Sequence, residues 1–213
     1  MLAQVPLFAD LDPAVLFALE RHTRLRRYQK RTVIIEKGEE SSVLYVLESG
    51  RAKVYVADDS GKEILLRELG PGDHFGELAL LGGSPRTASV MTLTDCEVRM
   101  LTGVVFKDFL AKQPEVALWL IRHLARQVAD LTDTASDLAL LSVYRRIAKV
   151  LDEGAREEDG RRITGPLTQQ YIADRVGCSR EMVSRIVGDL KTGGYVSVEG
   201  KRFVLERRLP ERW

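Results

Sequence analysis

The sequence predicts an α+β protein in three parts: a strand-rich N-terminal domain, one long helix, and a small C-terminal domain of short helices. Three observations support this prediction. Short apolar runs separated by turn residues fill the segment 32–101. An apolar stripe of helical period runs through 115–141. Two short amphipathic segments, joined by a glycine-containing turn, follow in 168–191. We therefore expect domains over 1–112 and 142–213, with the long helix and a hinge over 113–141.

Composition and charge restrict the class of protein. The chain has 213 residues, of which 45% are hydrophobic and 30% charged, as in ordinary globular proteins. The net charge is −3 up to Leu141 and +4 from Ser142 onward, which fits a sensor joined to a polyanion-binding domain. No apolar run approaches the roughly 20 residues of a membrane span, so we expect no membrane association. Residues 1–10 lack a basic segment followed by an apolar one, which favours a cytoplasmic location.

Enzyme chemistry and metal binding are not expected. Cys96 and Cys178 are far apart and form no CxxC pair, so both are expected to be small apolar residues rather than metal ligands. No Ser/His/Asp or Cys/His arrangement and no phosphate-binding P-loop occurs in the sequence. These observations predict a binding protein rather than an enzyme.

The N-terminal domain is expected to open with a helical segment over 7–27, in which Asp12 caps the helix and Pro13 occupies its first turn. Six strand-like runs follow, at 32–35, 43–47, 52–56, 63–66, 88–93 and 96–101. Many short strands at close spacing predict a sandwich or jelly roll. A short helix over 104–112 completes this domain.

The segment 75–88 is the most unusual part of this domain. Gly76 allows a tight turn and a close approach of the backbone to a ligand. The residues from Glu77 onward can form one helical turn whose first amides point at an anion. Arg86 can hold a phosphate with two parallel hydrogen bonds, and Thr87 adds a hydroxyl donor. Glu77 can accept hydrogen bonds from sugar hydroxyls. The alternative is a turn-rich connection with a surface arginine.

The long helix carries apolar positions whose spacing alternates between three and four residues, as in a helix–helix seam. The seam positions are Ala117, Leu120, Leu124, Gln127, Leu131, Thr134, Leu138 and Leu141, of which Gln127 and Thr134 are polar. A dimer contact is favoured because the stripe is much longer than a mean helix of about eleven residues. The alternative is a single amphipathic helix that packs on its own domain.

The C-terminal domain is expected to start with a helix capped by Ser142, after a hinge at 139–142. The charged segment 153–162 is expected to be a surface loop. A helix-turn-helix follows, because Gly177 lies where the turn needs a positive φ. The exposed side of the second helix presents Ser179, Arg180, Glu181, Ser184 and Arg185.

These side chains match the chemistry of base edges in the major groove. Arginine donates two hydrogen bonds to guanine, and glutamate accepts one from cytosine. A hairpin wing is predicted around Glu199-Gly200-Lys201. Lys201 and Arg202 at its tip are candidates for phosphate contacts, with a solvated tip as the alternative.

The segment 75–88 resembles the phosphate-binding cassette of cyclic-nucleotide-binding domains in the CRP/FNR superfamily of transcription regulators. The segment 179–185 resembles the recognition helix of the same superfamily, and the resemblance extends over nearly the whole chain. It implies a double-stranded β-helix sensor domain, a long dimerisation helix and a winged helix-turn-helix domain. It also implies that Gly76 and Glu77 contact the ribose, that Leu78 and Ala79 supply backbone around the phosphate, and that Arg86 and Thr87 hold the phosphate.

The resemblance implies a cyclic nucleotide as the effector. In cyclic-AMP-responsive members, a Thr-Ser pair on the long helix contacts the adenine. A register without gaps places Leu131 and Thr132 at these positions, and Gln127 where some members carry an arginine. Thr132 is expected to contact the ligand, with an interface hydroxyl as the alternative. Cyclic AMP is the expected effector, while cyclic-di-GMP or the absence of a nucleotide effector are the alternatives.

The resemblance further implies a homodimer that binds double-stranded DNA at a palindromic TGTGA-like site and contacts RNA polymerase. Ser184 also occurs in the oxygen-sensing branch, but the cysteine cluster of that branch is missing here. His22, His74 and His123 are expected to be surface or core residues rather than haem ligands. A rival from another class is a nucleotide-binding regulatory subunit that acts through protein contacts.

Overall fold

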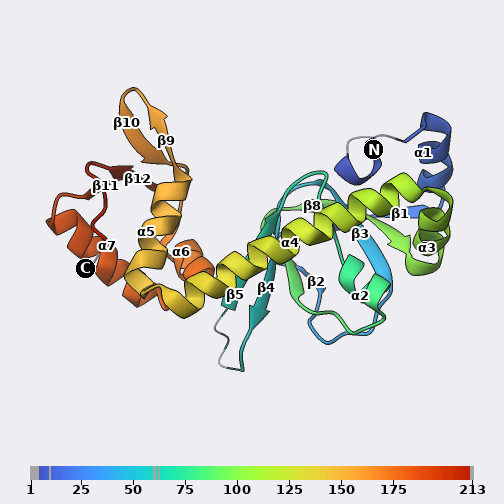
Figure 1. Ribbon diagram of the computed structural model, residues 1–213, viewed down its shortest axis with the longest axis horizontal. Coiled ribbons are helices and arrows are strands. Elements are labelled where there is room, and N and C mark those ends of the chain that lie inside the picture. The colour runs from blue at the N-terminus through green and yellow to red at the C-terminus, as the bar shows by residue number, and fades with distance from the viewer. Residues whose placement is uncertain (1–4, 10, 60, 62, 212–213) are drawn as a thin grey trace. The chain divides into compact units, whose positions relative to one another are not determined.

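The computed structural model describes residues 5–9, 11–59, 61 and 63–211 (Figure 1). Residues 1–4 and 10, which belong to the segment assessed for a leader, lie outside the described residues. The chain divides into two compact units. The first comprises Met1–Val56 and Leu66–Val128, and the second comprises Ala57–Leu65 and Ala129–Trp213.

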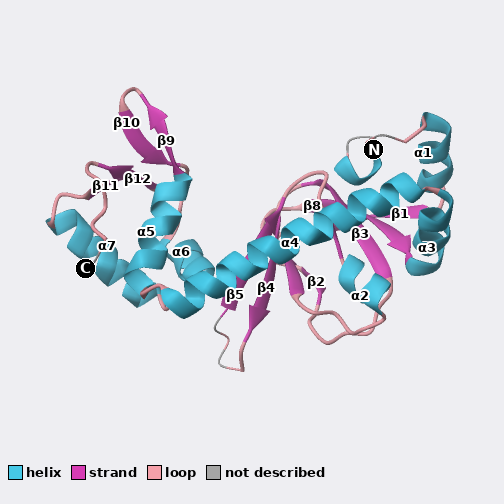
Figure 2. Cartoon of the chain, in the orientation of Figure 1, coloured by secondary structure: helices cyan, strands magenta, loops and turns pink. Residues whose placement is uncertain are grey.

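The first unit is a β-sandwich, with α1 and α3 together at one end and α4 running along it, as Figure 2 shows. Its antiparallel strands form two four-stranded sheets, ordered β1-β8-β3-β6 and β2-β7-β4-β5. The strands are β1 (Thr23–Tyr28), β2 (Val33–Ile35), β3 (Val43–Ser49), β4 (Ala52–Ala57), β5 (Glu63–Leu69), β6 (His74–Phe75), β7 (Ser89–Thr92) and β8 (Cys96–Thr102). The helices are η2 (Pro6–Phe8), α1 (Pro13–Glu20), α2 (Glu77–Gly82), α3 (Gly103–Lys112) and α4 (Pro114–Leu140), the last of which continues into the second unit. The predicted jelly-roll architecture is confirmed.

Strand β3 lies between the two hydrophobic cores of this unit. Its side chains alternate between two cores, as expected for a strand covered on both faces. Tyr45 and Leu47 face a core between the two sheets. Leu44 and Val46 face a second core, to which η2, α1, α3 and the first half of α4 contribute. The beginning of α4 is therefore held against the sheet that carries β6, immediately before the 75–88 segment.

One sequence prediction for this unit is wrong. The expected helical segment over 7–27 ends early, because Thr23–Tyr28 forms strand β1. This strand pairs with β8 along its whole length, from Thr23 opposite Leu101 to Tyr28 opposite Cys96. Most of its side chains are exposed, so the sequence shows little of the alternation that marks a half-buried strand. Backbone pairing with a distant strand decides its conformation.

Helix α4 is a single helix of 27 residues, which confirms the predicted long helix. The predicted seam register is wrong in its first half. Leu120 is buried, and Leu124 packs on the second core of its own domain. Each residue of the exposed stripe lies one position after a predicted seam residue, so the exposed stripe has the same alternating spacing of three and four residues. It consists of Leu118, Ile121, Ala125, Val128, Thr132, Ala135 and Ala139. Ile121 and Val128 are 61% and 62% exposed, which is unusual for large apolar side chains.

The second unit contains a helix-turn-helix and a four-stranded sheet of order β11-β12-β10-β9. Its elements are α5 (Val143–Gly154), β9 (Ala155–Glu158), β10 (Arg161–Thr164), α6 (Gln169–Val176), α7 (Arg180–Thr192), β11 (Val196–Glu199) and β12 (Arg202–Leu205). Ile147, Ile172, Val183 and Leu190 are fully buried in its core. Gly177 has a φ of 68° at the turn between α6 and α7, which confirms the reason for expecting glycine there.

The segment 153–162, expected to be a surface loop, instead forms the last residues of α5 and most of a β-hairpin. Strands β9 and β10 pair in register, with Arg161 opposite Glu158. Asp159 and Gly160 form the turn and have φ angles of 50° and 73°. An Asp-Gly pair with two positive φ angles is the preferred two-residue hairpin connection. The high charge of the segment masked this turn signal.

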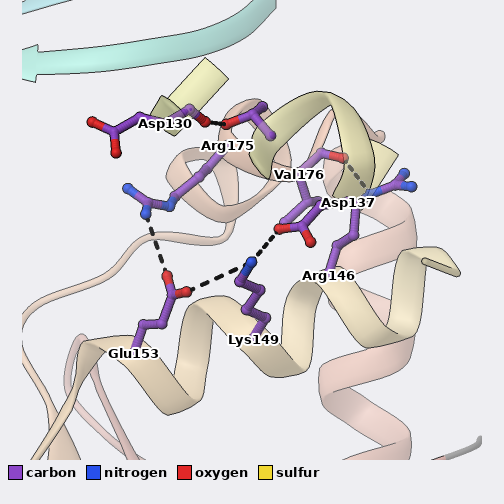
Figure 3. A network of polar contacts seen from close by, with 8 residues as sticks. Asp130, Asp137, Arg146, Lys149, Glu153, Arg175 and Val176 are labelled. Atoms are coloured by element: carbon purple, nitrogen blue, oxygen red, sulfur yellow. Dashed lines mark hydrogen bonds and ion pairs between the residues drawn. The ribbon is translucent and has the colours of Figure 1, made fainter. Parts of the chain in front are cut away.

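Ionic contacts connect the last turns of α4 with α5 and α6 within the second unit. Figure 3 shows Lys149 of α5 between the carboxylates of Asp137 and Glu153, the latter 4.0 Å away. Arg175 of α6 reaches the same Glu153 at 3.5 Å. These side chains are partly solvated, so each pair contributes little by itself, but together they join three helices.

Arg146 makes a second connection at the same place. Its Nε donates to the Val176 carbonyl oxygen at 2.9 Å (Figure 3). Its Nη1 donates to the Leu141 carbonyl oxygen, also at 2.9 Å. Helix α4 ends at Leu140 and α5 begins at Val143, where the hinge was expected. Arg146 therefore satisfies carbonyl groups that the helix ends leave without partners.

Candidate ligand site and nucleic-acid interface

Gly76 is the residue that shapes the candidate ligand site. It lies between β6 and α2 with a φ of 86°. A Cβ added here would lie 2.5 Å from Nη1 of Arg86 and 2.9 Å from the carbonyl oxygen of Val43. Both distances are too short for real contacts. Glycine is therefore required both by the backbone conformation and by the close approach of the arginine.

Arg86 is a buried cation, only 3% exposed. It donates hydrogen bonds to the Gly76 carbonyl oxygen at 2.7 Å, to Ser41 Oγ at 3.0 Å and to the Val43 carbonyl oxygen at 2.8 Å. All three acceptors are neutral. Its Nε is buried and has no partner among the described residues. A buried charge with neutral partners and an unused donor is costly unless an anion joins it, which favours an anionic ligand at this site.

Glu77 is buried next to this cation, at 3% exposure. Burial raises the pKa of its carboxyl. The charges of Arg67 and Arg86 and a hydrogen bond with the Gln127 side chain act in the opposite direction and favour the carboxylate. The site thus offers a donor-rich guanidinium for an anion and an acceptor for hydroxyl groups.

The other predicted ligand residues occupy different environments. Ala79 is buried, whereas Leu78 is 43% exposed and Thr87 is also exposed, next to Arg86 in the chain. The structure therefore brings Gly76 and Glu77 together with Arg86. Thr132 lies on the exposed stripe of α4 in the second unit, and its ligand role remains a prediction.

An imidazole–indole cluster beside Glu77 was missed by sequence reasoning. The rings of Trp119 and His123 on α4 stack with centroids 5.0 Å apart, and the ring of His74 on β6 lies 4.7 Å from that of His123. Arg67 of β5 and Gln127 of α4 contact His123. His74 and His123 were expected to be ordinary surface or core residues. Only the recurrence of Trp119, His123 and Gln127 every four residues on one helix face hinted at a cluster.

The recognition helix α7 presents its polar side to solvent. Arg180, Glu181, Ser184 and Arg185 are all exposed, while Val183 is buried in the domain core. Ser179 caps the helix by accepting a hydrogen bond from the Met182 backbone nitrogen at 3.2 Å. The predicted base-contacting residues therefore lie on the free face of the first two turns.

A groove separates α7 from the wing formed by β11 and β12. It has a volume of about 440 Å³, and its walls include Ser184 and Lys191 of α7 and Lys201 of the wing. Lys191 was not among the predicted site residues, although it lies seven residues after Ser184, on the same side of the helix. Two lysines on this groove favour a polyanionic partner.

Arg202, named with Lys201 as a candidate for phosphate contacts, has a different role in the structure. Its Nη2 forms an ion pair with Glu158 at 2.5 Å, and its Nε donates to the Thr164 carbonyl oxygen at 3.0 Å. Both partners belong to the β9–β10 hairpin. Arg202 therefore connects strands of the sheet. The sequence did not predict this role, because the hairpin that supplies its partners was expected to be a surface loop.

Two family models match the chain. Residues 25–113 match the cyclic nucleotide-binding domain, and residues 145–209 match the Crp-like helix-turn-helix domain. Among curated proteins, the chain is 31% identical to the CRP-like cAMP-activated global transcriptional regulator of Mycobacterium tuberculosis, over 96% of this chain and 94% of that protein. It is 35% identical to the cAMP-activated global transcriptional regulator CRP of Haemophilus influenzae, over 91% and 88% of the two chains.

Solved structures show the same similarity. The c-di-GMP responsive global regulator CLP of Xanthomonas campestris matches with a TM-score of 0.79 and 26% identity, over 92% of this chain and all of that chain. The catabolite activator protein of Thermus thermophilus matches with a TM-score of 0.58 and 28% identity, over 95% and 94% of the two chains.

A buried arginine–glutamate cassette in a jelly roll, followed by a long helix and a helix-turn-helix, defines a class of protein: a cyclic-nucleotide-responsive, DNA-binding regulator rather than an enzyme. More particularly, the chain belongs to the CRP/FNR family of transcription regulators, as its curated relatives show over more than nine-tenths of its length. In the part of the chain that the structure describes, no group of three or more His, Cys, Asp or Glu residues is placed to hold a metal ion. None of the described helices is long and apolar enough to span a membrane.

Proposed function

We propose that this chain is a homodimeric transcription regulator that binds cyclic AMP in its sensor domain and a palindromic TGTGA-like site with its recognition helices. The observation that carries the ligand assignment is Arg86, a buried cation with neutral acceptors and an unused Nε donor. The names of the Mycobacterium and Haemophilus relatives support cyclic AMP as the effector.

In this proposal, Arg86 and Thr87 hold the cyclic phosphate, and Glu77 accepts a hydrogen bond from the ribose hydroxyl. Gly76 provides the space that Arg86 needs. Backbone groups of Leu78 and Ala79 complete the phosphate environment, and Thr132 contacts the base.

Cyclic-di-GMP is the second candidate effector, and two observations favour it. The structural match to the c-di-GMP responsive regulator has a TM-score of 0.79 and covers all of that chain. Leu131 also stands where cyclic-AMP-responsive members carry a threonine, which removes one hydroxyl that faces adenine.

Sequence readout is assigned to the exposed first turns of α7. Arg180 and Arg185 contact guanine, and Glu181 accepts from cytosine N4. Ser184, which also occurs in the oxygen-sensing branch, makes the base preference at its position intermediate between the two branches. The Ser179 hydroxyl keeps its capping role and donates to a phosphate. Lys201 contacts phosphates from the wing.

The exposed stripe of α4 provides the dimer seam. Its apolar side chains, which include Ile121 and Val128, repeat with the alternating spacing of a two-helix contact. Ligand binding shifts the population of the dimer toward the arrangement in which the two recognition helices are about 34 Å apart, one turn of DNA. RNA polymerase is the proposed partner of the DNA-bound dimer.

Fluorescence anisotropy of a labelled TGTGA-N6-TCACA duplex tests this proposal at fixed salt. Cyclic AMP is expected to tighten binding, and the Arg86→Ala variant is expected to lose this response while it keeps its basal DNA affinity. Tightening or release by cyclic-di-GMP alone would assign the second effector. Specific binding that ignores both nucleotides would indicate a regulator without a nucleotide effector. The absence of any preference over random DNA would favour a regulatory subunit that acts through protein contacts.

A further inference from the structure

His123 contacts polar side chains from two elements of the first unit. Nη1 of Arg67, on β5, lies 3.4 Å from His123 Nε2. The amide nitrogen of Gln127, one turn further along α4, lies 2.6 Å from the same atom. The second nitrogen of the Arg67 guanidinium donates to the carbonyl oxygen of His74 at 3.1 Å, which fixes the arginine against β6.

The Arg67 contact favours one protonation state of the ring. An arginine can only donate, and a nitrogen that faces its N–H group must accept. The Arg67 contact is therefore favourable only to a neutral ring that carries its proton on Nδ1. A protonated Nε2 would face the Arg67 cation directly.

Gln127 extends the contact to the ligand cassette. Its side chain also favours the charged form of Glu77, which lies at the start of α2 and is 3% exposed. When His123 Nε2 carries no proton, both partners of Gln127 are acceptors, and Gln127 can serve them only with its NH₂ group. The orientation of the amide thus depends on a neutral His123.

We propose that Arg67, His123 and Gln127 form a proton-sensitive relay that positions the Glu77 carboxylate for the ligand, so that nucleotide binding requires a neutral His123. The inference rests on the proposed function, because it assigns a role to these residues in the same pocket. A proton on His123 Nε2 turns the Gln127 oxygen toward the ring and removes the amide donor from Glu77. Acid then loosens the carboxylate that accepts the ribose hydroxyl.

The groups around His123 favour its neutral form, as the proposed pH dependence of ligand binding requires. Burial lowers the pKa of His123, and the nearby charges of Arg67 and Arg126 lower it further, while Asp73 acts in the opposite direction. The neighbouring His74 does not compete for the proton, because burial lowers its pKa to about 3. His123 is thus neutral at pH 7, and ligand affinity is complete above its pKa and decreases as the pH falls through it.

Two variants of His123 separate positioning from packing. His123→Gln supplies a neutral acceptor, whereas His123→Phe keeps a ring against Trp119 and has no acceptor. We expect calorimetry with cyclic AMP at pH 7.5 to show at least tenfold weaker binding for His123→Phe and near wild-type binding for His123→Gln. Wild-type affinity in both variants would overturn the proposal.

The pH profile provides the second readout. Below the His123 pKa, the wild-type Kd is expected to rise about tenfold per pH unit, because one proton must leave before binding. His123→Gln is expected to remove this step, and the exposed His22→Gln is expected to keep it. A step that persists in His123→Gln would belong to Glu77 and would refute the role of His123.

The relay exists without ligand, so its failure can be told apart from a failure of the proposed function. Nitrogen NMR of the ligand-free protein reports the tautomer of each of the three histidines. An Nδ1–H tautomer of His123 with a pKa below its ordinary value is expected, and Arg67→Met is expected to raise that pKa. An Nε2–H tautomer would overturn the relay, whether or not cyclic AMP binds.

Discussion

Replacement of Gly76 by alanine should damage the ligand site far more than the same change elsewhere on the same helix. Gly83, at the other end of α2, provides the matched control. It has a φ of 66°, and a Cβ added there meets nothing within 4 Å. Gly76 has a φ of 86°, and a Cβ added there meets the Arg86 guanidinium at 2.5 Å. The two variants therefore share the conformational strain and differ in the clash.

The size of the difference follows from these contacts. A left-handed conformation costs an alanine roughly 1–2 kcal/mol at either position. At Gly76 the clash also displaces Arg86 from the Gly76 carbonyl oxygen, which it contacts at 2.7 Å. A hydrogen bond from a charged group contributes about 1.5–3 kcal/mol. Gly76→Ala is thus expected to lower the free energy of unfolding by about 1.5–3 kcal/mol more than Gly83→Ala.

Urea denaturation followed by tryptophan fluorescence measures the stability difference, and calorimetry with cyclic AMP measures the binding. Gly76→Ala is expected to weaken nucleotide affinity at least tenfold, because the phosphate-holding cation is displaced, whereas Gly83→Ala keeps wild-type affinity. Equal destabilisation together with equal affinity in the two variants would show that Gly76 serves only the backbone turn. The account of Arg86 as the phosphate ligand would then be wrong.

Three further predictions concern DNA binding and assembly. Arg185→Ala should lose roughly 1–3 kcal/mol of preference for the specific duplex over random DNA in competition anisotropy, and an unchanged preference would contradict base readout. Lys191→Ala should reduce the slope of log affinity against log salt by about one, since it removes one phosphate contact. Arg202→Ala, the control, should leave that slope unchanged but lower the unfolding temperature, because its partners are Glu158 and the Thr164 backbone. Ile121→Asp should shift the sedimentation coefficient toward a monomer at micromolar concentration, and a stable dimer would contradict the seam assigned to the exposed stripe.

Helix α4 shows why apolar periodicity alone could not identify which face of the helix forms the dimer seam. The helix has two apolar stripes one position apart, and each has the alternating spacing of a seam. Leu120 belongs to the stripe that packs on the domain core, and Ile121 to the stripe that stays exposed. Hydrophobicity could not distinguish them, because both stripes are apolar. Only the position of the sheet beneath the helix decides which face is covered by the chain itself.

In the candidate site, too, some residues were predictable from the sequence and others only from the tertiary structure. Gly76, Glu77 and Arg86 were predicted from local chemistry, because a cassette confined to the short segment 75–88 keeps its turn and its charges close together. The contacts of Arg67 and His74 with His123 join β5 and β6 to a helix some fifty residues later in the chain, and no local pattern encodes such a pairing. The same holds for Arg202, whose partner Glu158 comes from a hairpin 44 residues earlier.

By itself, the sequence predicted the order of the domains, the long helix and the glycine turn at Gly177, and it carries the residue chemistry proposed for the cassette and the recognition helix. These features depend on short-range rules: apolar periodicity, capping hydroxyls and backbone conformations that favour glycine. Tertiary structure alone decided that Thr23–Tyr28 is a strand, which stripe of α4 remains exposed, and that His123 contacts both Arg67 and Gln127. These outcomes depend on which distant surfaces meet, because burial and pairing across the fold outweigh the weak local preferences of the residues involved.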